Sequence, residues 1–172
     1  DGVHYEEAHY EGYGPGGVAL LIEVATDNRN RTSSDVRNLL TKYGGSMAAV
    51  GAVAYLFKPW GVIEVAKPSI AEDAAMEAAL EAGAEDVTTE TDYYEVLTPV
   101  ASFEDVKQAL LARHAELLHA DITKIASVQV PLSEKKAAAT LRLVDALEDH
   151  EDVQKVYANF SITEDVLARL SS

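Results

Sequence analysis

The chain has 172 residues, of which 48% are hydrophobic and 25% charged, so it can bury a core as one large domain or as two small ones. It contains no cysteine, which excludes both a disulfide framework and a thiolate metal site. Its net charge of −15 argues against binding a polyanion over the whole surface.

The acidic excess is concentrated in the middle of the chain. Residues 59–132 hold 4 Lys and Arg against 14 Asp and Glu, a net charge of −10, whereas residues 1–58 carry −2 and residues 133–172 carry −3. Most runs of like charge lie on a solvated surface, and the simplest interpretation is that these acidic side chains do so too. The alternative is an acidic surface for a basic partner, such as a ribosomal protein.

The N-terminal stretch predicts a strand, a glycine loop and a second strand. We expect the first strand over Tyr5–Tyr13 and the second over Val18–Val24, where a nearly continuous apolar run is typical of a strand covered on both faces. The loop between them requires the backbone freedom of glycine. Its residues are Gly12, Gly14, Pro15, Gly16 and Gly17.

A capped helix follows this second strand. The sequence predicts that residues 27–31 form an exit turn and that Thr32 caps the helix, with Asp35 in its first turn. Apolar residues then recur at helical spacing, and Gly44-Gly45 closes the helix. We expect another buried strand over Ala52–Phe57 and a turn over residues 58–61.

The middle of the chain has the pattern of a ferredoxin-like βαββαβ domain. Ser69 and Glu72 form a capping-box pair at the start of its first predicted helix. The predicted elements are a strand over 62–66, a helix over 69–80, strands over 86–90 and 94–98, a helix over 102–118 and a strand over 125–130.

The C-terminal part, a helix over 134–149, a strand over 153–160 and a short helix after Thr163, has too few strands to form a domain alone. We therefore predict an α+β fold of two α/β-type domains. A discontinuous α+β domain comprises residues 1–58 plus 133–172, and the acidic ferredoxin-like domain, residues 59–132, is inserted into it.

The glycine loop satisfies the spacing G-x-G-x-x-G of a dinucleotide-binding fingerprint. That fingerprint follows a strand and opens a helix whose N-terminus meets the pyrophosphate. Here the glycines lead into the apolar strand Val18–Val24. A structural turn between two strands fits this order, so we predict a structural role for the loop.

Basic and amide side chains gather just after this strand. Arginine and amide groups are those that contact phosphates and base edges, so the cluster is a candidate contact for nucleic acid or the ribosome. The alternative is that Arg29 or Arg31 pairs with Asp27 or Asp35 and only pins the turn. The candidate residues are Asn28, Arg29, Asn30, Arg31, Arg37 and Lys42.

The sequence offers no catalytic constellation, which predicts a protein that is not an enzyme and has no cofactor and no metal. His114 and His119 are five residues apart, a spacing that does not place metal ligands on one helix face, and we expect most of the five histidines to be exposed. No G-x-S-x-G, P-loop or H-E-x-x-H motif occurs. Tyr93 and Tyr94 lack the signatures of an RNA-recognition motif.

Several separated motifs resemble the YebC family, which includes the mitochondrial translational activator of cytochrome oxidase subunit I. They are YEGYGPGG, TDNRNRT, a helix ending in KYGG, GAVAYLF and, near the C-terminus, LEDHEDVQKVYANF. The sequence departs from the usual GGNLG of the family at Gly44-Gly45-Ser46-Met47-Ala48, which makes that loop less polar.

The resemblance implies a non-enzymatic regulator of gene expression. Family members are described as DNA-binding transcriptional regulators, while others act in translation, at the ribosome or on messenger RNA, and both alternatives stay open. The family carries a basic helical domain ahead of this region, so we expect nucleic acid, DNA or RNA, to bind mainly through that domain. No membrane partner is expected, and the location would be the bacterial cytoplasm or the mitochondrial matrix.

Overall fold

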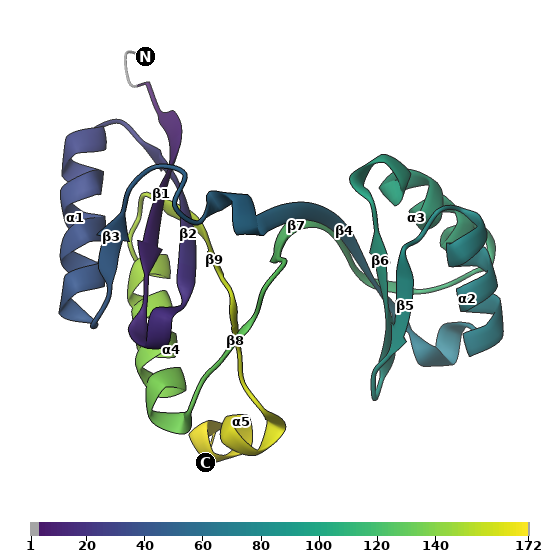
Figure 1. Cartoon of the computed structure of the whole chain (residues 1–172). Helices are drawn as coiled ribbons and strands as arrows, with labels where there is room; N and C mark the ends of the chain where they lie inside the picture. The colour runs from purple at the N-terminus through teal and green to yellow at the C-terminus, as the bar shows by residue number, and fades with distance from the viewer. Residues whose placement is uncertain (1–3, 172) are drawn as a thin grey trace. The chain divides into compact units, whose positions relative to one another are not determined.

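The computed structural model of the chain describes residues 4–171. By its internal contacts the chain divides into two compact units, one of residues 1–57 with 126–172 and one of residues 58–125. Helices and strands are mixed in both units, so the α+β class expected from the sequence is confirmed (Figure 1). Each unit has a hydrophobic core of its own.

The first unit contains a four-stranded sheet in the order β3-β1-β2-β9, in which every neighbouring pair is antiparallel. A short parallel pair, β8 with β10, lies outside this sheet. The elements of this unit are β1 (Glu6–Tyr13), β2 (Ala19–Thr26), α1 (Arg29–Lys42), β3 (Ser46–Ala48), β8 (Val130–Pro131), α4 (Glu134–Glu148), β9 (Val153–Ala158), β10 (Phe160–Ser161) and α5 (Glu164–Ser171).

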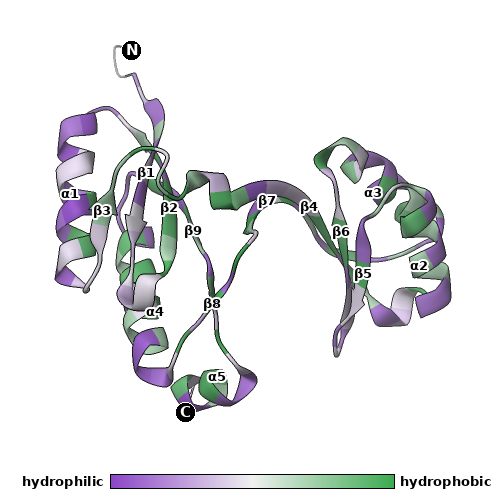
Figure 2. Cartoon of the chain, in the orientation of Figure 1, coloured by the Kyte–Doolittle hydropathy of each residue, from purple (hydrophilic) through white to green (hydrophobic). Residues whose placement is uncertain are grey.

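Strand β2 is the centre of the first unit and is covered on both faces, as its apolar run predicted. Leu20 and Ile22 lie in one core with residues of α1 and α4, whereas Leu21 packs on the opposite face with Val53 and Phe57. The apolar residues of β2 and the mixed faces of the helices can be followed in Figure 2. Burial of this strand therefore fixes which sides of α1 and α4 remain at the surface.

The second unit is a ferredoxin-like βαββαβ arrangement. Its sheet has the order β5-β6-β4-β7, and α2 and α3 contribute to its core. The elements are β4 (Phe57–Ala66), α2 (Glu72–Glu81), β5 (Asp86–Thr89), β6 (Tyr93–Thr98), α3 (Phe103–Ala112) and β7 (Leu117–Ala126). The unit ends at Ile125, not at the Leu132 boundary expected from the sequence.

Two expectations near the junction at residue 57 are wrong. Residues 52–56 do not form the expected strand, because a bend and a short 3-10 helix, Ala54–Leu56, occupy this stretch. Strand β4 instead begins at Phe57 and runs through residues 58–61, which the composition had indicated as a turn. Gly61 is required inside this strand, because a Cβ there would collide with Thr98 and Phe103.

The expected boundaries of the second unit also need correction at Ser69 and His114. Ser69 does not cap α2: its hydroxyl donates to the carbonyl of Ala66 and accepts the N–H of Glu116. Helix α3 ends at Ala112, because the chain turns at His114 with a φ of 65°. Residues 117 and 118, whose leucines imitate a helical continuation, already belong to β7, so the expected strand over 125–130 is misplaced.

Within residues 4–171, no helix has the length and apolar character needed to span a membrane.

Candidate nucleic-acid interface on helix α1

Helix α1 begins earlier than its sequence suggested. Asn28 is the N-cap, and its side-chain oxygen accepts the backbone N–H of Arg31 at 3.1 Å. Arg29 and Asn30 are therefore helical, and Thr32, the expected cap, lies one turn inside. Asn is among the strongest N-cap residues, and its amide oxygen satisfies a helix donor that would otherwise lack a partner.

Thr32 is buried because it binds a carboxylate from the far end of the chain. Its hydroxyl donates to Oδ2 of Asp152 at 2.7 Å, and the same oxygen accepts from the guanidinium of Arg31 at 3.0 Å. The hydroxyl of Thr26 lies 2.7 Å from that of Thr32 and accepts the N–H of Asn28. We call Thr26, Arg31, Thr32 and Asp152 the Asp152 network.

Charge and hydrogen bonding keep Asp152 ionised although only 5% of its surface is exposed. The hydroxyl of Thr32 and then the guanidinium of Arg31 lower the pKa of Asp152, against the opposing effect of burial. In return, Asp152 and Asp27 raise the pKa of Arg31. A buried carboxylate with these donors is stable only while they remain in place.

His150 ties the same end of the chain to the side of α1. Its Nδ1 accepts the N–H of Asp152 at 3.1 Å, so the neutral ring carries its proton on Nε2, which lies 2.9 Å from Oδ2 of Asp35. The side chain of His150 is only 16% exposed, so His150 is not one of the exposed histidines that the sequence predicted. This contact occupies the carboxylate of Asp35, which lies in the central part of α1.

The structure divides the candidate residues into two groups. Asn28 and Arg31 have structural roles, as cap and as partner of Asp27 and Asp152. The second group is exposed on α1 and consists of Arg29, Asn30, Arg37 and Lys42. Their nearest interactions are weak. Arg29 lies 3.8 Å from an exposed carboxylate of Glu6.

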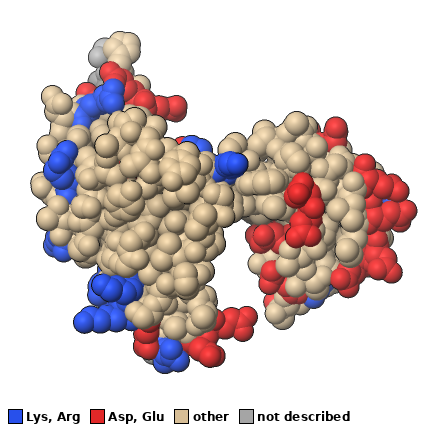
Figure 3. All heavy atoms as spheres, viewed as in Figure 1, with Lys and Arg blue, Asp and Glu red and all other residues tan. Residues whose placement is uncertain are grey.

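Positions 34, 37, 38, 41 and 42 share one face of α1 by helical spacing, and all of them are exposed. We call them the α1 outer face. It carries one serine, one threonine, one asparagine, Arg37 and Lys42, and no carboxylate. Basic side chains on this helix are visible in Figure 3. Donors of this kind suit phosphates and base edges, and the nearest carboxylate of the helix, Asp35, is bonded to His150.

An open hollow of about 260 Å³ lies beside the α1 outer face. Asn38, Leu39 and Lys42 line it from the helix, together with Asp35 and His150. The hollow therefore joins exposed donors of α1 to the His150–Asp35 contact.

The glycine loop closes the hairpin of β1 and β2. Gly12 has no room for a Cβ, which would meet the carbonyl of Ser46 and the side chain of Leu40. Gly14 donates its N–H to the carbonyl of Val18 at 2.8 Å. Gly16 and Gly17 have positive φ angles of 79° and 85°, and Pro15 is buried.

Glu11 is a buried carboxylate that sequence reasoning did not single out. Its oxygens accept the backbone N–H groups of Gly51, Val53 and Ala54 at 2.6–2.8 Å. Burial by itself raises the pKa of Glu11, but these bonds together outweigh burial and lower it. Glu11 therefore anchors the irregular segment 49–56 to β1.

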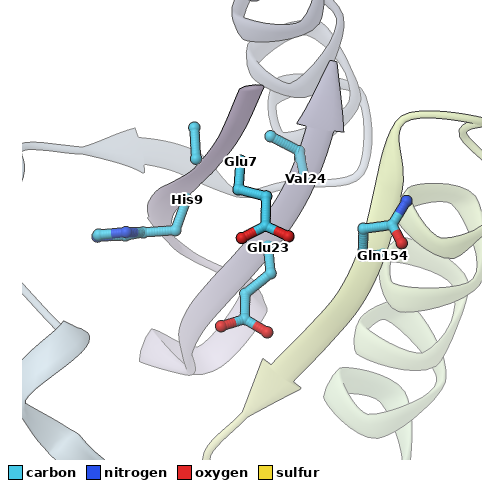
Figure 4. Close-up of a pocket in the computed structure, with 6 residues that line it drawn as sticks. Glu7, His9, Glu23, Val24 and Gln154 are labelled. Atoms are coloured by element: carbon cyan, nitrogen blue, oxygen red, sulfur yellow. The ribbon is translucent and has the colours of Figure 1, made fainter. Parts of the chain in front are cut away.

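A second hollow, of about 350 Å³, lies on the sheet of the first unit, and Glu7, His9, Glu23, Val24 and Gln154 are among its lining residues (Figure 4). Its carboxylates make it a poor site for a polyanion. Among the residues that the structure describes, no group of three potential ligands is arranged to hold a metal ion.

The second unit has a cluster of carboxylates on its sheet. Glu64 of β4 is directly opposite Glu95 of β6. Burial, and then the charges of Glu90 and Glu64, raise the pKa of Glu95. Burial and the same carboxylates also raise the pKa of Tyr93, whereas Tyr94 is in the core. Like charges directly opposite each other destabilise a strand pair.

Comparisons with known proteins identify the family. The family model described as TACO1/YebC second and third domain matches residues 5–160. The chain belongs to the YebC family. A probable transcriptional regulatory protein of Trichlorobacter lovleyi is 51% identical over 170 residues, which cover 99% of this chain and 68% of that protein. One from Sulfurihydrogenibium sp. is 46% identical over 172 residues, with 99% and 68% covered.

The fold also matches a solved structure, that of a conserved hypothetical protein from Aquifex aeolicus. The two share 41% of their sequence with a TM-score of 0.81, over 97% of this chain and 69% of the other. In this YebC-family chain, the motifs TDNRNRT and LEDHEDVQKVYANF meet in the Asp152 network. Asn159 of the second motif is also buried, and its side-chain oxygen accepts the N–H of Ala19.

Replacing Asp152 by Asn should lower the free energy of unfolding of the first unit by about 2–3 kcal/mol at pH 7, because a buried charged acceptor is lost. The folded-state pKa of Asp152 is lowered, so its contribution is fully present at neutral pH, begins to decline near the ordinary carboxyl pKa of about 4, and is lost as the pH falls through the lowered folded-state pKa. Urea denaturation followed by circular dichroism at several pH values measures both effects.

The matched control is Glu151→Gln, which removes an exposed carboxylate next in sequence. It should change stability by less than about 0.5 kcal/mol. Equal losses in the two variants, or a loss for Asp152→Asn that does not shrink as the pH falls below about 4, would show that the Asp152 network does not hold α1 in place.

Proposed function

We propose that this chain is part of a non-enzymatic regulator of gene expression that binds DNA, and that the α1 outer face contacts the nucleic acid. The proposal is supported by the exposed Arg37, Asn38 and Lys42 on a face without carboxylates. The relatives named probable transcriptional regulatory proteins support the same role at the level of the family.

The alternative within this class is a translation factor that acts at the ribosome or on messenger RNA. The α1 outer face suits both targets, because phosphates and base edges occur in DNA and in RNA. The net charge of −15 makes tight binding of duplex DNA by residues 1–172 alone unfavourable. We therefore place most of the electrostatic affinity in the part of the longer relatives beyond the matched region.

Reversing two charges on α1, Arg37→Glu with Lys42→Glu, tests this proposal in the protein at its natural full length. Nucleic-acid binding should weaken at least about tenfold. The slope of log K against log salt concentration should become smaller by the equivalent of about two phosphate contacts. Fluorescence anisotropy with duplex DNA and with ribosomal RNA, each over a salt series, reports both and tells the two targets apart.

Lys58→Glu with Arg113→Glu is the control, because it makes the same charge change at exposed sites of the second unit. Arg113 takes part only in a long surface pair with Glu77, at 3.5 Å. The α1 proposal fails if this control weakens binding as strongly as the α1 variant does.

A second candidate function is a protein-interaction module, in which the acidic second unit docks a basic protein. The observation that favours it is the direct opposition of Glu64 and Glu95, which has a cost in the free unit. Residues 58–125 carry 5 Lys and Arg against 14 Asp and Glu, a net charge of −9. A cationic partner would relieve this repulsion.

Glu64→Gln with Glu95→Gln should therefore stabilise the free second unit by about 0.2–1 kcal/mol at pH 7, measured by thermal unfolding. Because the pKa of Glu95 is raised, the wild-type unit regains this stability as the pH falls, and the difference should vanish below about pH 4. Glu81→Gln with Glu85→Gln, at exposed positions, is the control. A destabilised Glu64/Glu95 variant would contradict the proposed repulsion.

A further inference from the structure

Three segments meet at the end of the first unit that carries the glycine loop. A Cβ on Gly44, just after α1, would lie 3.7 Å from Cγ of Pro15. A Cβ on Gly16 would lie 3.8 Å from Cβ of Lys136, in the first turn of α4. The glycine loop therefore packs between the end of α1 and the start of α4.

Exposed cations lie on both sides of this loop. Lys42 is on the α1 side, where its Nζ lies 5.5 Å from the ring centre of Tyr43. Lys135, Lys136 and Arg142 are exposed on α4. Within residues 4–171, none of these four side chains takes part in an ion pair.

Carboxylates are almost absent from these segments. Residues 12–18, 41–46 and 133–142 contain one, Glu134, and it accepts from Nε of Arg169 at 2.7 Å. Asp145 and Asp149 lie further along α4, beside Arg142 and Tyr43. The loop and the first turn of α4 therefore carry Lys135 and Lys136 with one carboxylate, which is already paired, while the nearby α5 adds Glu164 and Asp165.

The loop itself leaves its backbone accessible. Gly16 and Gly17 are both exposed and have positive φ angles. Gly17 has no atom within 4 Å of the place where a Cβ would stand, so packing does not require glycine there. A bare turn flanked by cations lets an anion approach the main chain closely.

We infer that this turn surface, defined as Gly16, Gly17, Lys135, Lys136 and Arg142, binds phosphate groups of a nucleic-acid backbone. Its cations are exposed and extend along α4, which suits a chain of phosphates running over an open surface. Lys42 makes it continuous with the α1 outer face. The inference rests on the proposed function, because both take nucleic acid as the ligand, but the turn surface consists of residues outside the α1 outer face.

The test is Lys135→Glu with Lys136→Glu in the protein at its natural full length. Both positions are exposed and lie in the first turn of α4, where Glu is favourable, so the helix should form normally. Binding of a fluorescein-labelled 20-nucleotide RNA and of a 20-base-pair DNA duplex should weaken at least about tenfold, with a smaller salt dependence.

Two comparisons make the result specific. Gly17→Asn adds a side chain that tolerates positive φ without changing charge, and it should weaken binding several-fold. The Lys58→Glu with Arg113→Glu control should change binding less than about twofold. Binding by the Lys135/Lys136 variant equal to that of the control overturns the inference.

The α1 variant separates this inference from the proposed function. If Arg37→Glu with Lys42→Glu binds normally while Lys135→Glu with Lys136→Glu does not, the α1 contact fails and the turn surface stands. The converse result rejects the turn surface alone. If ATP or inorganic phosphate at micromolar concentration displaces the RNA and the DNA, the ligand is a small phosphate compound, and the backbone assignment is overturned.

Discussion

The carboxylate of Asp152 connects two ends of the sequence, and the first unit depends on this connection. Thr32 and Arg31 lie 120 and 121 residues away along the chain, yet both bind the same oxygen. The interaction fixes the first turn of α1 against β9, while β2, buried on both faces, lies between the helices and the segment around Phe57. Removing either partner would leave a buried charge or hydroxyl without its bond.

This constraint explains why a cluster of basic and amide residues serves two purposes. Asn28 and Arg31 start and hold the helix, as its cap and as the partner of Asp152. The helix is held in this way, and the α1 outer face then presents Arg37 and Lys42, with the neighbouring Asp35 bonded to His150. Within this cluster, Asn28 and Arg31 therefore have structural roles, whereas Arg37 and Lys42 have the proposed contact with nucleic acid.

The sequence was sufficient for the pattern of helices and strands where periodicity was strong, as in β2, α1 and the ferredoxin-like unit. It was insufficient where a local signal had two explanations. The sequence predicted Thr32 as the N-cap, whose hydroxyl would accept a backbone N–H of the first turn, but this hydroxyl donates to Asp152. The roles of Glu11 and Asp152 depend on contacts with residues 40 to 121 positions away, which no local pattern reveals.

The most direct test of the account is ultraviolet crosslinking of the full-length protein in cells, with the attached nucleotides mapped by mass spectrometry and the nucleic acid identified as DNA or ribosomal RNA. The account predicts adducts on peptides from α1, residues 29–42, and from the start of α4, residues 134–142. Adducts confined to residues 58–125, or absent from both helices, would contradict it.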